Sequence, residues 1–457
     1  MKTTEQVNSP LTRLFPLFSN RPVNMKREIL AGVTTFLTMA YIIAVNPNIL
    51  SATGMPAGAL VTATCLSAAL GCFIMGLIAD LPFALASGMG LNAFFAFTVV
   101  IGMKVPWEIA LTAVFVEGII FIILTLFKVR EAVVNSIPVN MKLAVTGGIG
   151  LFIAMIGLSG SGIIVANEST LVALGEFTPA AIVACVGLVL IAVLDKRGVK
   201  GAILIGIVVS SLLAWGYAMI NPAHARELGI FLPEGLFKFE SMAPIAGKVD
   251  FSYMTHPANL GAFIGIVCTF LFVDFFDTAG TLVAVGNEIG LVNEKGELEN
   301  AEQALLADSI GTCVGAALGT STVTSFVESS SGVGVGGRTG LTAITTGVFF
   351  ILSIFISPLV LGLITNAVTA PALIVVGVMM AQQMKNVKWD DITIAIPAFV
   401  TIISMILMYS ISNGIAFGFI SYVVVMLAAG RAKEIHPTVW VLMVIFLFYF
   451  ASPYLSF

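Results

Sequence analysis

Three acidic residues lie inside long apolar stretches of this sequence. Asp274 and Asp277 fall within residues 271–285, and Glu328 comes directly before a run of Ser and Gly. Together with Thr281, the two aspartates are spaced i, i+3 and i+7, so their side chains share one face of a helix. A charged side chain at the centre of a bilayer costs at least about 2.5–3.5 kcal/mol. No Lys or Arg lies in the surrounding apolar stretches to pair with these acids, so the pattern indicates ligand binding.

The chemistry available to such carboxylates is hydrogen bonding and proton exchange. A carboxylate accepts two N–H donors at once, which suits a planar heterocycle with adjacent N–H groups. A carboxyl group shielded from water can also exchange a proton within the physiological range, as proton coupling requires. Asn92, in another Gly-rich segment, offers an amide donor and acceptor, and Phe276 offers a ring face for stacking. Asp274 has a second interpretation, in which it caps backbone groups of a facing broken helix.

The composition places the chain in lipid. Of 457 residues, 58% are hydrophobic and 10% are charged, and the mean hydropathy is +1.05. Soluble globular chains carry about 25% charged residues, whereas charges are rare and costly in a bilayer. The lack of a Lys/Arg-rich tract argues against nucleic-acid binding. With no His in the apolar runs and no CxxC pair, the sequence also argues against an intramembrane enzyme and a metal site.

Apolar runs long enough to cross a bilayer recur along the whole chain. Each span needs about 20 apolar residues, and turn signals divide the runs into two sets of seven. Basic residues precede the first span, so residues 1–27 are expected to be cytoplasmic, and the later basic loops fit fourteen spans. Residues 436–453 fit either a fifteenth span or an interfacial helix. The expected spans are 28–46, 57–79, 84–101, 108–128, 142–160, 178–195, 201–220, 260–286, 303–319, 323–336, 341–365, 371–385, 391–411 and 413–430.

The two sets of spans form a repeat. Residues 28–220 make the first unit and residues 258–430 the second, joined by an extracytoplasmic loop (221–257) and followed by a hydrophobic segment (431–457). Seven is odd, so successive units face opposite ways, as in many secondary transporters. The third span of each unit is short and rich in Gly and Ser, which indicates a midplane binding site. The predicted fold is an all-α polytopic membrane protein with an inverted repeat and two broken helices that meet at the midplane.

Four stretches carry a resemblance to a known family. They are AGVTTFLTMAYIIAVNP (31–47), ASGMGLNAFFAF (86–97), FVDFFDTAGTL (272–282) and TSFVESSSGVGVGGRTGLTA (324–343). With these motifs the sequence resembles the AzgA-like purine permease branch of the nucleobase–cation symporter family. The resemblance implies a seven-plus-seven inverted repeat with core and gate domains, whose third and tenth spans carry short extended pieces followed by half-helices. It also implies proton-coupled uptake of adenine, guanine or hypoxanthine across the inner membrane without a cofactor, and it suggests a homodimer.

The resemblance assigns roles by position within these motifs. It implies that Asp277 and Glu328 bind the substrate, supported by Asn92, Asp274 and Thr281. The two substrate-binding carboxyl groups are also the candidates for proton coupling. A fourth intramembrane acid, Glu117, is interpreted as structural or peripheral. The expected substrate-binding residues are Asp277, Glu328, Asn92, Thr281, Asp274, Ser329 and Phe276, with no metal ligand.

Two other transport functions stay open at this point. An anion transporter can share the inverted-repeat plan, because helix N-termini attract anions, although Glu328 would repel an anion there. A uracil or xanthine carrier of the wider family is the second alternative. The FFDTAGT pattern, with Thr281 in it, looks more like the adenine, guanine and hypoxanthine branch.

Overall fold

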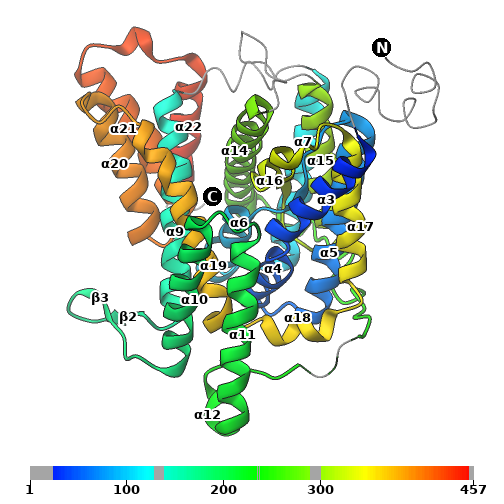
Figure 1. Ribbon diagram of the computed structural model, residues 1–457. Coiled ribbons are helices and arrows are strands. Elements are labelled where there is room, and N and C mark those ends of the chain that lie inside the picture. Colours follow the sequence, from blue (N-terminus) through cyan, green and yellow to red (C-terminus); the bar gives the residue numbers. More distant parts are fainter. Residues whose placement is uncertain (1–23, 128–137, 234, 236, 289–299, 452–457) are drawn as a thin grey trace, which may run out of the picture.

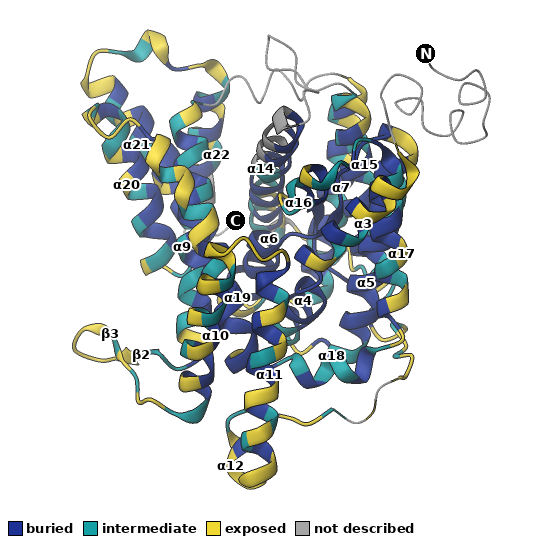
Figure 2. Ribbon diagram, viewed as in Figure 1, coloured by how far each residue is buried: buried dark blue, intermediate teal, exposed yellow. Residues whose placement is uncertain are grey.

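The protein consists of two groups of helices that stand side by side (Figure 1). The computed structural model describes residues 24–127, 138–233, 235, 237–288 and 300–451. Within these residues, eight helical segments are long and apolar enough to cross a membrane, and shorter apolar helices accompany them. Many exposed residues lie on the outer faces of the helices, and the faces between helices are buried (Figure 2).

The described residues of the first half of the chain form thirteen elements of secondary structure. In order they are α3 (Met25–Met39), α4 (Ile42–Ser51), α5 (Ala57–Ile74), η1 (Met75–Ala79), β1 (Leu85–Ser87), α6 (Met89–Ala93), η2 (Phe94–Gly102), α7 (Trp107–Leu126), α9 (Val139–Gly160), β2 (Ile164–Asn167), β3 (Leu171–Leu174), α10 (Pro179–Lys196) and α11 (Ala202–Ile220).

The second half begins after a connection that itself contains α12 (Pro222–Glu227) and α13 (Ser252–Thr255). Its elements are α14 (Pro257–Glu288), α15 (Ala301–Leu318), β4 (Val323–Ser325), α16 (Ser329–Val335), α17 (Gly340–Ser353), α18 (Ser357–Leu363), α19 (Asn366–Ala381), η3 (Gln382–Asn386), α20 (Ile392–Leu407), α21 (Ile411–Ala428), η4 (Ala432–Glu434) and α22 (Pro437–Ala451).

Two short extended segments cross near the middle of the molecule. β1 and β4 form an antiparallel pair with Ala86 opposite Thr324, and each is followed by a short helix, α6 or α16. A side chain at Gly88 would lie 2.6 Å from Thr324 Cγ2, so glycine permits this close approach. The pairing satisfies backbone groups that would otherwise be unpaired at membrane depth. The prediction of two broken helices that meet is confirmed.

The helices fall into two groups, each of which combines both halves of the chain. We call α3, α4, α5, α7, α14, α15 and α17, together with the crossing segments, the core group. In this group α17 packs on α3 and α5, and α15 packs on α5 and α7. The gate group contains α9, α10, α11, α19, α20 and α21, with α19 packed along α9 and α20 along α21. Each group thus contains helices from both halves of the chain.

In the gate group, the two halves of the chain approach each other closely where α9 contacts α19. A Cβ atom at Gly377 would lie 2.4 Å from the Gly150 carbonyl oxygen, and one at Gly150 would lie 2.6 Å from that of Gly377. Small residues allow such approach between helices in lipid, where van der Waals packing drives association.

Some expected boundaries differ from the structure because local signals act differently in context. The first span is interrupted at Tyr41, and Pro47 lies inside α4 rather than ending the span. A proline is tolerated in a membrane helix when neighbours satisfy the freed backbone group. Residues 341–365 are not one span, because Pro358 stands in the first turn of a separate helix, α18, where its fixed φ is favourable.

The hydrophobic segment near the C-terminus forms one short helix, α22. α22 is 15 residues long and packs on α21 and α14. At 1.5 Å per residue it extends over about 22 Å, less than the bilayer's hydrocarbon thickness of about 30 Å. Most of the expected cytoplasmic segment 1–27 lies outside the described residues.

Candidate functional site

A small cavity lies at the crossing, where the core group faces the gate group. It encloses about 70 Å³, which is less than the about 300–1,000 Å³ of typical small-molecule clefts. Asp277 and Thr281 line it from α14, and Glu328 lines it from the residue before α16. Val376 and Met380 of α19 line it from the gate group. The structure therefore brings three of the expected site residues together.

Glu328 is contacted by the interrupted first span. Tyr41 Oη donates a hydrogen bond to Glu328 Oε1 at 2.5 Å, and Thr38 Oγ1 donates to the Glu328 backbone carbonyl at 3.5 Å. Both residues lie close to the break between α3 and α4. Tyr41 is buried and lines the same cavity, so its phenol belongs to the site.

Asp277, on α14 of the core group, faces the gate group. A Cβ atom at Gly88 would lie 3.8 Å from Asp277 Oδ2, so this carboxylate faces the start of α6. A second, narrower space brings Asp277 beside Thr146 and Ile149 of α9. Two carboxylates around one space can accept N–H donors or exchange protons. Among the described residues, no group of three or more His, Cys, Asp or Glu side chains is arranged to hold a metal ion.

Asp274 takes part in a buried network and does not line the cavity. Its Oδ1 accepts a hydrogen bond from Thr278 Oγ1 at 3.3 Å, and the same hydroxyl lies 3.0 Å from Asp308 Oδ2 and 2.7 Å from Thr324 Oγ1. Asp308 of α15 also accepts a hydrogen bond from the backbone N–H of Ser325 at 3.1 Å. The network connects α14 and α15 to β4, and thereby positions the crossing.

Two further expected residues bond to the crossing segments. Asn92 Nδ2 donates to the Ser87 carbonyl at 3.3 Å, because helical side chains point back toward the preceding turn. Ser329 Oγ accepts a hydrogen bond from the Ala84 backbone N–H at 3.0 Å. Neither residue lines the cavity described above. The side chain of Phe276 lies outside the described residues.

Sequence reasoning missed Tyr41 and Asp308. Both stand in apolar spans, and for Asp308 a charge within residues 303–319 was an available signal. Tyr41 lies in the motif at residues 31–47, but an isolated Tyr in an apolar run is typical of packing. Glu117, interpreted as structural or peripheral, is buried and accepts a hydrogen bond from Thr322 Oγ1 at 3.1 Å, beside the crossing.

Similarity to known permeases extends along almost the whole chain. A family described as a permease family matches residues 26–417. The chain belongs to this permease family. Adenine permease AdeP of Escherichia coli (strain K12) is 43% identical over 438 residues, which cover 96% of this chain and 95% of that protein. Guanine/hypoxanthine permease PbuG of Bacillus subtilis (strain 168) is 45% identical over 448 residues, which cover 96% and 99%. The expectation of a transporter rather than an enzyme is confirmed.

Solved transporter structures share the fold of this permease. The transmembrane domain of the cyanobacterial bicarbonate transporter BicA matches with a TM-score of 0.64 at 14% identity, covering 86% of this chain and 98% of that one. The SLC26A9 structure matches with a TM-score of 0.63 at 12% identity, covering 94% and 70%. At these identities the likeness concerns the fold alone. The predicted polytopic inverted-repeat architecture is confirmed.

Proposed function

We propose that this permease takes up purine nucleobases (adenine, guanine or hypoxanthine) together with protons by alternating access. The observation that carries the proposal is the placement of Asp277 and Glu328 around one cavity between the core group and the gate group. Relatives named as adenine and guanine/hypoxanthine permeases, similar over nearly the full length, support the purine class.

In the proposed complex, the two carboxylates accept N–H donors along one edge of the base. A carboxylate has about four lone-pair sites, so the hydrogen bond from Tyr41 to Glu328 leaves acceptor capacity for the ligand. One of the two carboxyl groups carries the coupled proton, and in that form it can donate a hydrogen bond to a base carbonyl. Such a pair can therefore serve bases with an exocyclic amine or a carbonyl.

Substrate entry requires the two helix groups to separate. A space of about 70 Å³ is well below the about 300–1,000 Å³ of typical small-molecule clefts, so a base fits only after the space has widened. On the side of the gate group, α19 side chains line the central cavity, and α9 side chains line the narrower space next to it. A movement of the gate group relative to the crossing would widen the cavity and open it to one face of the membrane at a time.

In the same proposal, the permease lies in the inner membrane and its N-terminus lies in the cytoplasm. Lys200 Nζ donates to the Ser331 carbonyl at 3.3 Å, so the α10–α11 turn meets α16 at the end of the molecule near Arg338. Basic residues gather at cytoplasmic ends of membrane helices. The homodimer implied by the family resemblance is part of the same proposal.

The geometry does not favour the anion alternative. The solved structures with this fold include a bicarbonate transporter, but two carboxylates line the cavity of this permease. Negative charge around the binding space repels an anion, since like charges destabilise each other at close range.

The test is uptake of labelled adenine, guanine, hypoxanthine and uracil into cells that lack their own carriers, with and without a protonophore. We expect protonophore-sensitive accumulation of at least one purine and its loss in both Asp277→Asn and Glu328→Gln. The matched control is Asp195→Asn, an exposed acid at the end of α10. Preferential uptake of uracil would overturn the purine class, and concentrative uptake by the double carboxylate variant would overturn the site.

A further inference from the structure

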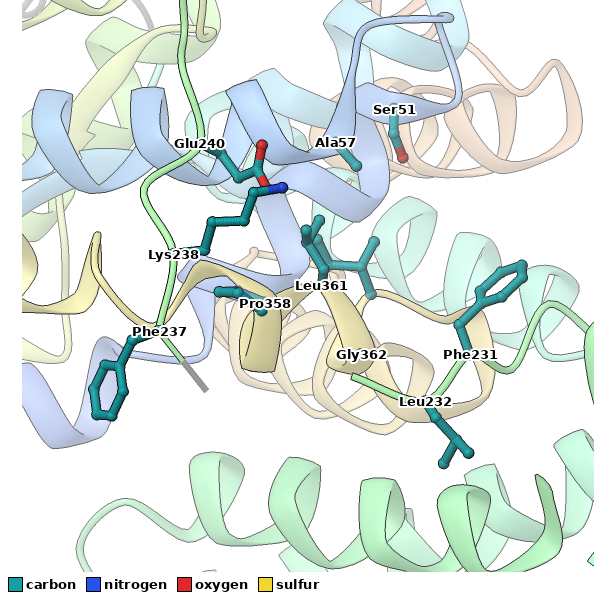
Figure 3. Close-up of a pocket in the computed structure, with 11 residues that line it drawn as sticks. Ser51, Ala57, Phe231, Leu232, Phe237, Lys238, Glu240, Pro358, Leu361 and Gly362 are labelled. Carbon is teal, nitrogen blue, oxygen red and sulfur yellow. The ribbon is translucent and has the colours of Figure 1, made fainter. Parts of the chain in front are cut away.

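A second and roomier cavity is lined partly by α18 (Figure 3). Figure 1 places α18 at the end of the molecule opposite the start of α3. The cavity is open on one side and has a volume of about 580 Å³, within the about 300–1,000 Å³ range of small-molecule clefts. Its walls come from the α4–α5 turn, from the connection after α12 and from α18. In the proposed orientation this is the outer face of the membrane.

The connection that forms one wall is attached to the core group at two points. The Lys238 backbone N–H donates to the Phe355 carbonyl at 3.0 Å, and Thr62 Oγ1 donates to the Glu240 carbonyl at 2.6 Å. This segment therefore runs between α5 and the α17–α18 turn. These bonds give the cavity a defined wall in place of a free loop.

The lining combines apolar surfaces with one charged pair. Lys238 Nζ lies 2.6 Å from Glu240 Oε1, and a Cβ atom at Gly58 would lie 3.3 Å from Glu240 Oε2, so the carboxylate rests against the first turn of α5. In Figure 3, Leu361 lies between this pair and Leu232. Apolar walls suit the faces of a flat ring, while adjacent donor and acceptor groups suit the polar edge of a nitrogen heterocycle.

The cavity adjoins a contact between the core group and the gate group. Ser51, which lines the cavity, donates its hydroxyl to the Asn48 carbonyl at 3.1 Å. Asn48 Nδ2 in turn donates to Asn366 Oδ1 and to Thr369 Oγ1, each at 3.0 Å. This contact joins α4 to the first turns of α19. Further along α19, Val376 lines the central site, about 15 Å from Asn366 at 1.5 Å per residue.

We propose that this cavity is an outer vestibule that binds the transported class of ligand, a planar uncharged nitrogen heterocycle, before the ligand reaches the central carboxylates. The inference rests on the proposed function and adds a second binding place to it. The Asn48–Asn366 contact separates the vestibule from the central site, and the ligand passes when that contact opens.

The first test is equilibrium binding of labelled adenine and hypoxanthine to purified Asp277→Asn protein in nanodiscs. We expect weak residual binding that is lost when Leu361→Trp, which fills the vestibule, is added. Leu232→Trp enlarges a second lining residue without altering a helix and should act alike. The matched control is Leu352→Trp, because Leu352 is 56% exposed on the outside of α17 and does not line the cavity.

The second test is uptake by the single variants. We expect Leu361→Trp and Leu232→Trp to lower kcat/KM for purine uptake about tenfold, which corresponds to about 1.4 kcal/mol, with Leu352→Trp unchanged. Normal uptake by both vestibule variants, or residual binding that neither variant reduces, would overturn the proposal. Absence of labelled base from the Asp277→Asn protein, as expected if a phospholipid fills the cavity, would overturn it as well. A wild-type protein that takes up no purine would instead refute the proposed function.

Discussion

At the scale of single residues, neighbouring acids have different tasks. Asp277 lines the cavity, whereas Asp274, three residues earlier, bonds to Thr278 in the network with Asp308. The two residues are about one helical turn apart on α14. Asp277 faces the cavity, whereas Asp274 lies on the buried side next to β4. Buried polar networks that are well bonded stabilise one arrangement, so we expect the acids of the network to affect transport through the position of the crossing.

Tyr41→Phe tests the hydrogen bond that contacts Glu328. The substitution keeps the ring and removes the phenol that donates at 2.5 Å. Hydrogen bonds to charged groups contribute about 1.5–3 kcal/mol, so the Kd for a purine is expected to rise about tenfold or more. Binding of labelled hypoxanthine to purified protein measures this change. Tyr422→Phe, in α21 and outside the cavity, is the control. Equal Kd values for the two variants would show that the Tyr41 phenol does not position Glu328.

At the scale of elements, glycines allow close backbone contacts at the β1–β4 crossing and between α9 and α19. Gly88 allows β1 to turn into α6 against Thr324, and Gly150 and Gly377 allow α9 and α19 to touch. In lipid there is no hydrophobic force between helices, so these contacts depend on shape. The wall of the central site formed by α19 is therefore positioned by glycine packing on α9.

Gly377→Ala tests that packing. The added methyl group would lie 2.4 Å from the Gly150 carbonyl oxygen, and overpacking of this kind costs about 1–3 kcal/mol. We expect a lower Tm of the purified protein and reduced uptake. The control is Gly216→Ala in α11, where an added Cβ meets nothing within 4 Å. A Tm for Gly377→Ala as high as that of Gly216→Ala would contradict the assigned contact.

At the scale of the whole molecule, the candidate site is lined from both helix groups, so the proposed transport requires the two groups to move. Polar contacts connect the groups at both ends, Asn48 with Asn366 at one and Lys200 with the Ser331 carbonyl at the other. Alternating access requires these contacts to form and break in turn. The central cavity, lined from both groups, changes its volume in the same movement.

Joining Asn48→Cys and Asn366→Cys with a short cleavable thiol cross-linker tests this movement. The side chains at these positions are in hydrogen-bonding contact, with Asn48 Nδ2 3.0 Å from Asn366 Oδ1. We expect purine uptake to stop on cross-linking and to return after the linker is cleaved. Each single cysteine variant, treated in the same way, controls for the five native cysteines. Undiminished uptake by the cross-linked protein would show that α4 and α19 do not separate during transport.

Much of this architecture follows from local properties of the sequence. Runs of apolar residues predict membrane spans, and the cost of a charge in lipid singles out Asp277 and Glu328 as functional candidates. Interrupted Gly-rich segments in both halves predict the crossing of β1 with β4, because such composition weakens helix wherever it occurs. These inferences need only composition and spacing along the chain.

Tertiary structure alone decides which of these residues meet. Tyr41 and Glu328 are 287 positions apart, and no spacing rule relates them. Asn92 and Ser329 belong to the expected broken segments, but the packing of those segments turns their side chains onto the backbone of β1 and the residue before it. Spacing within one helix predicts a shared face, whereas the neighbour of that face depends on how separate helices pack in three dimensions.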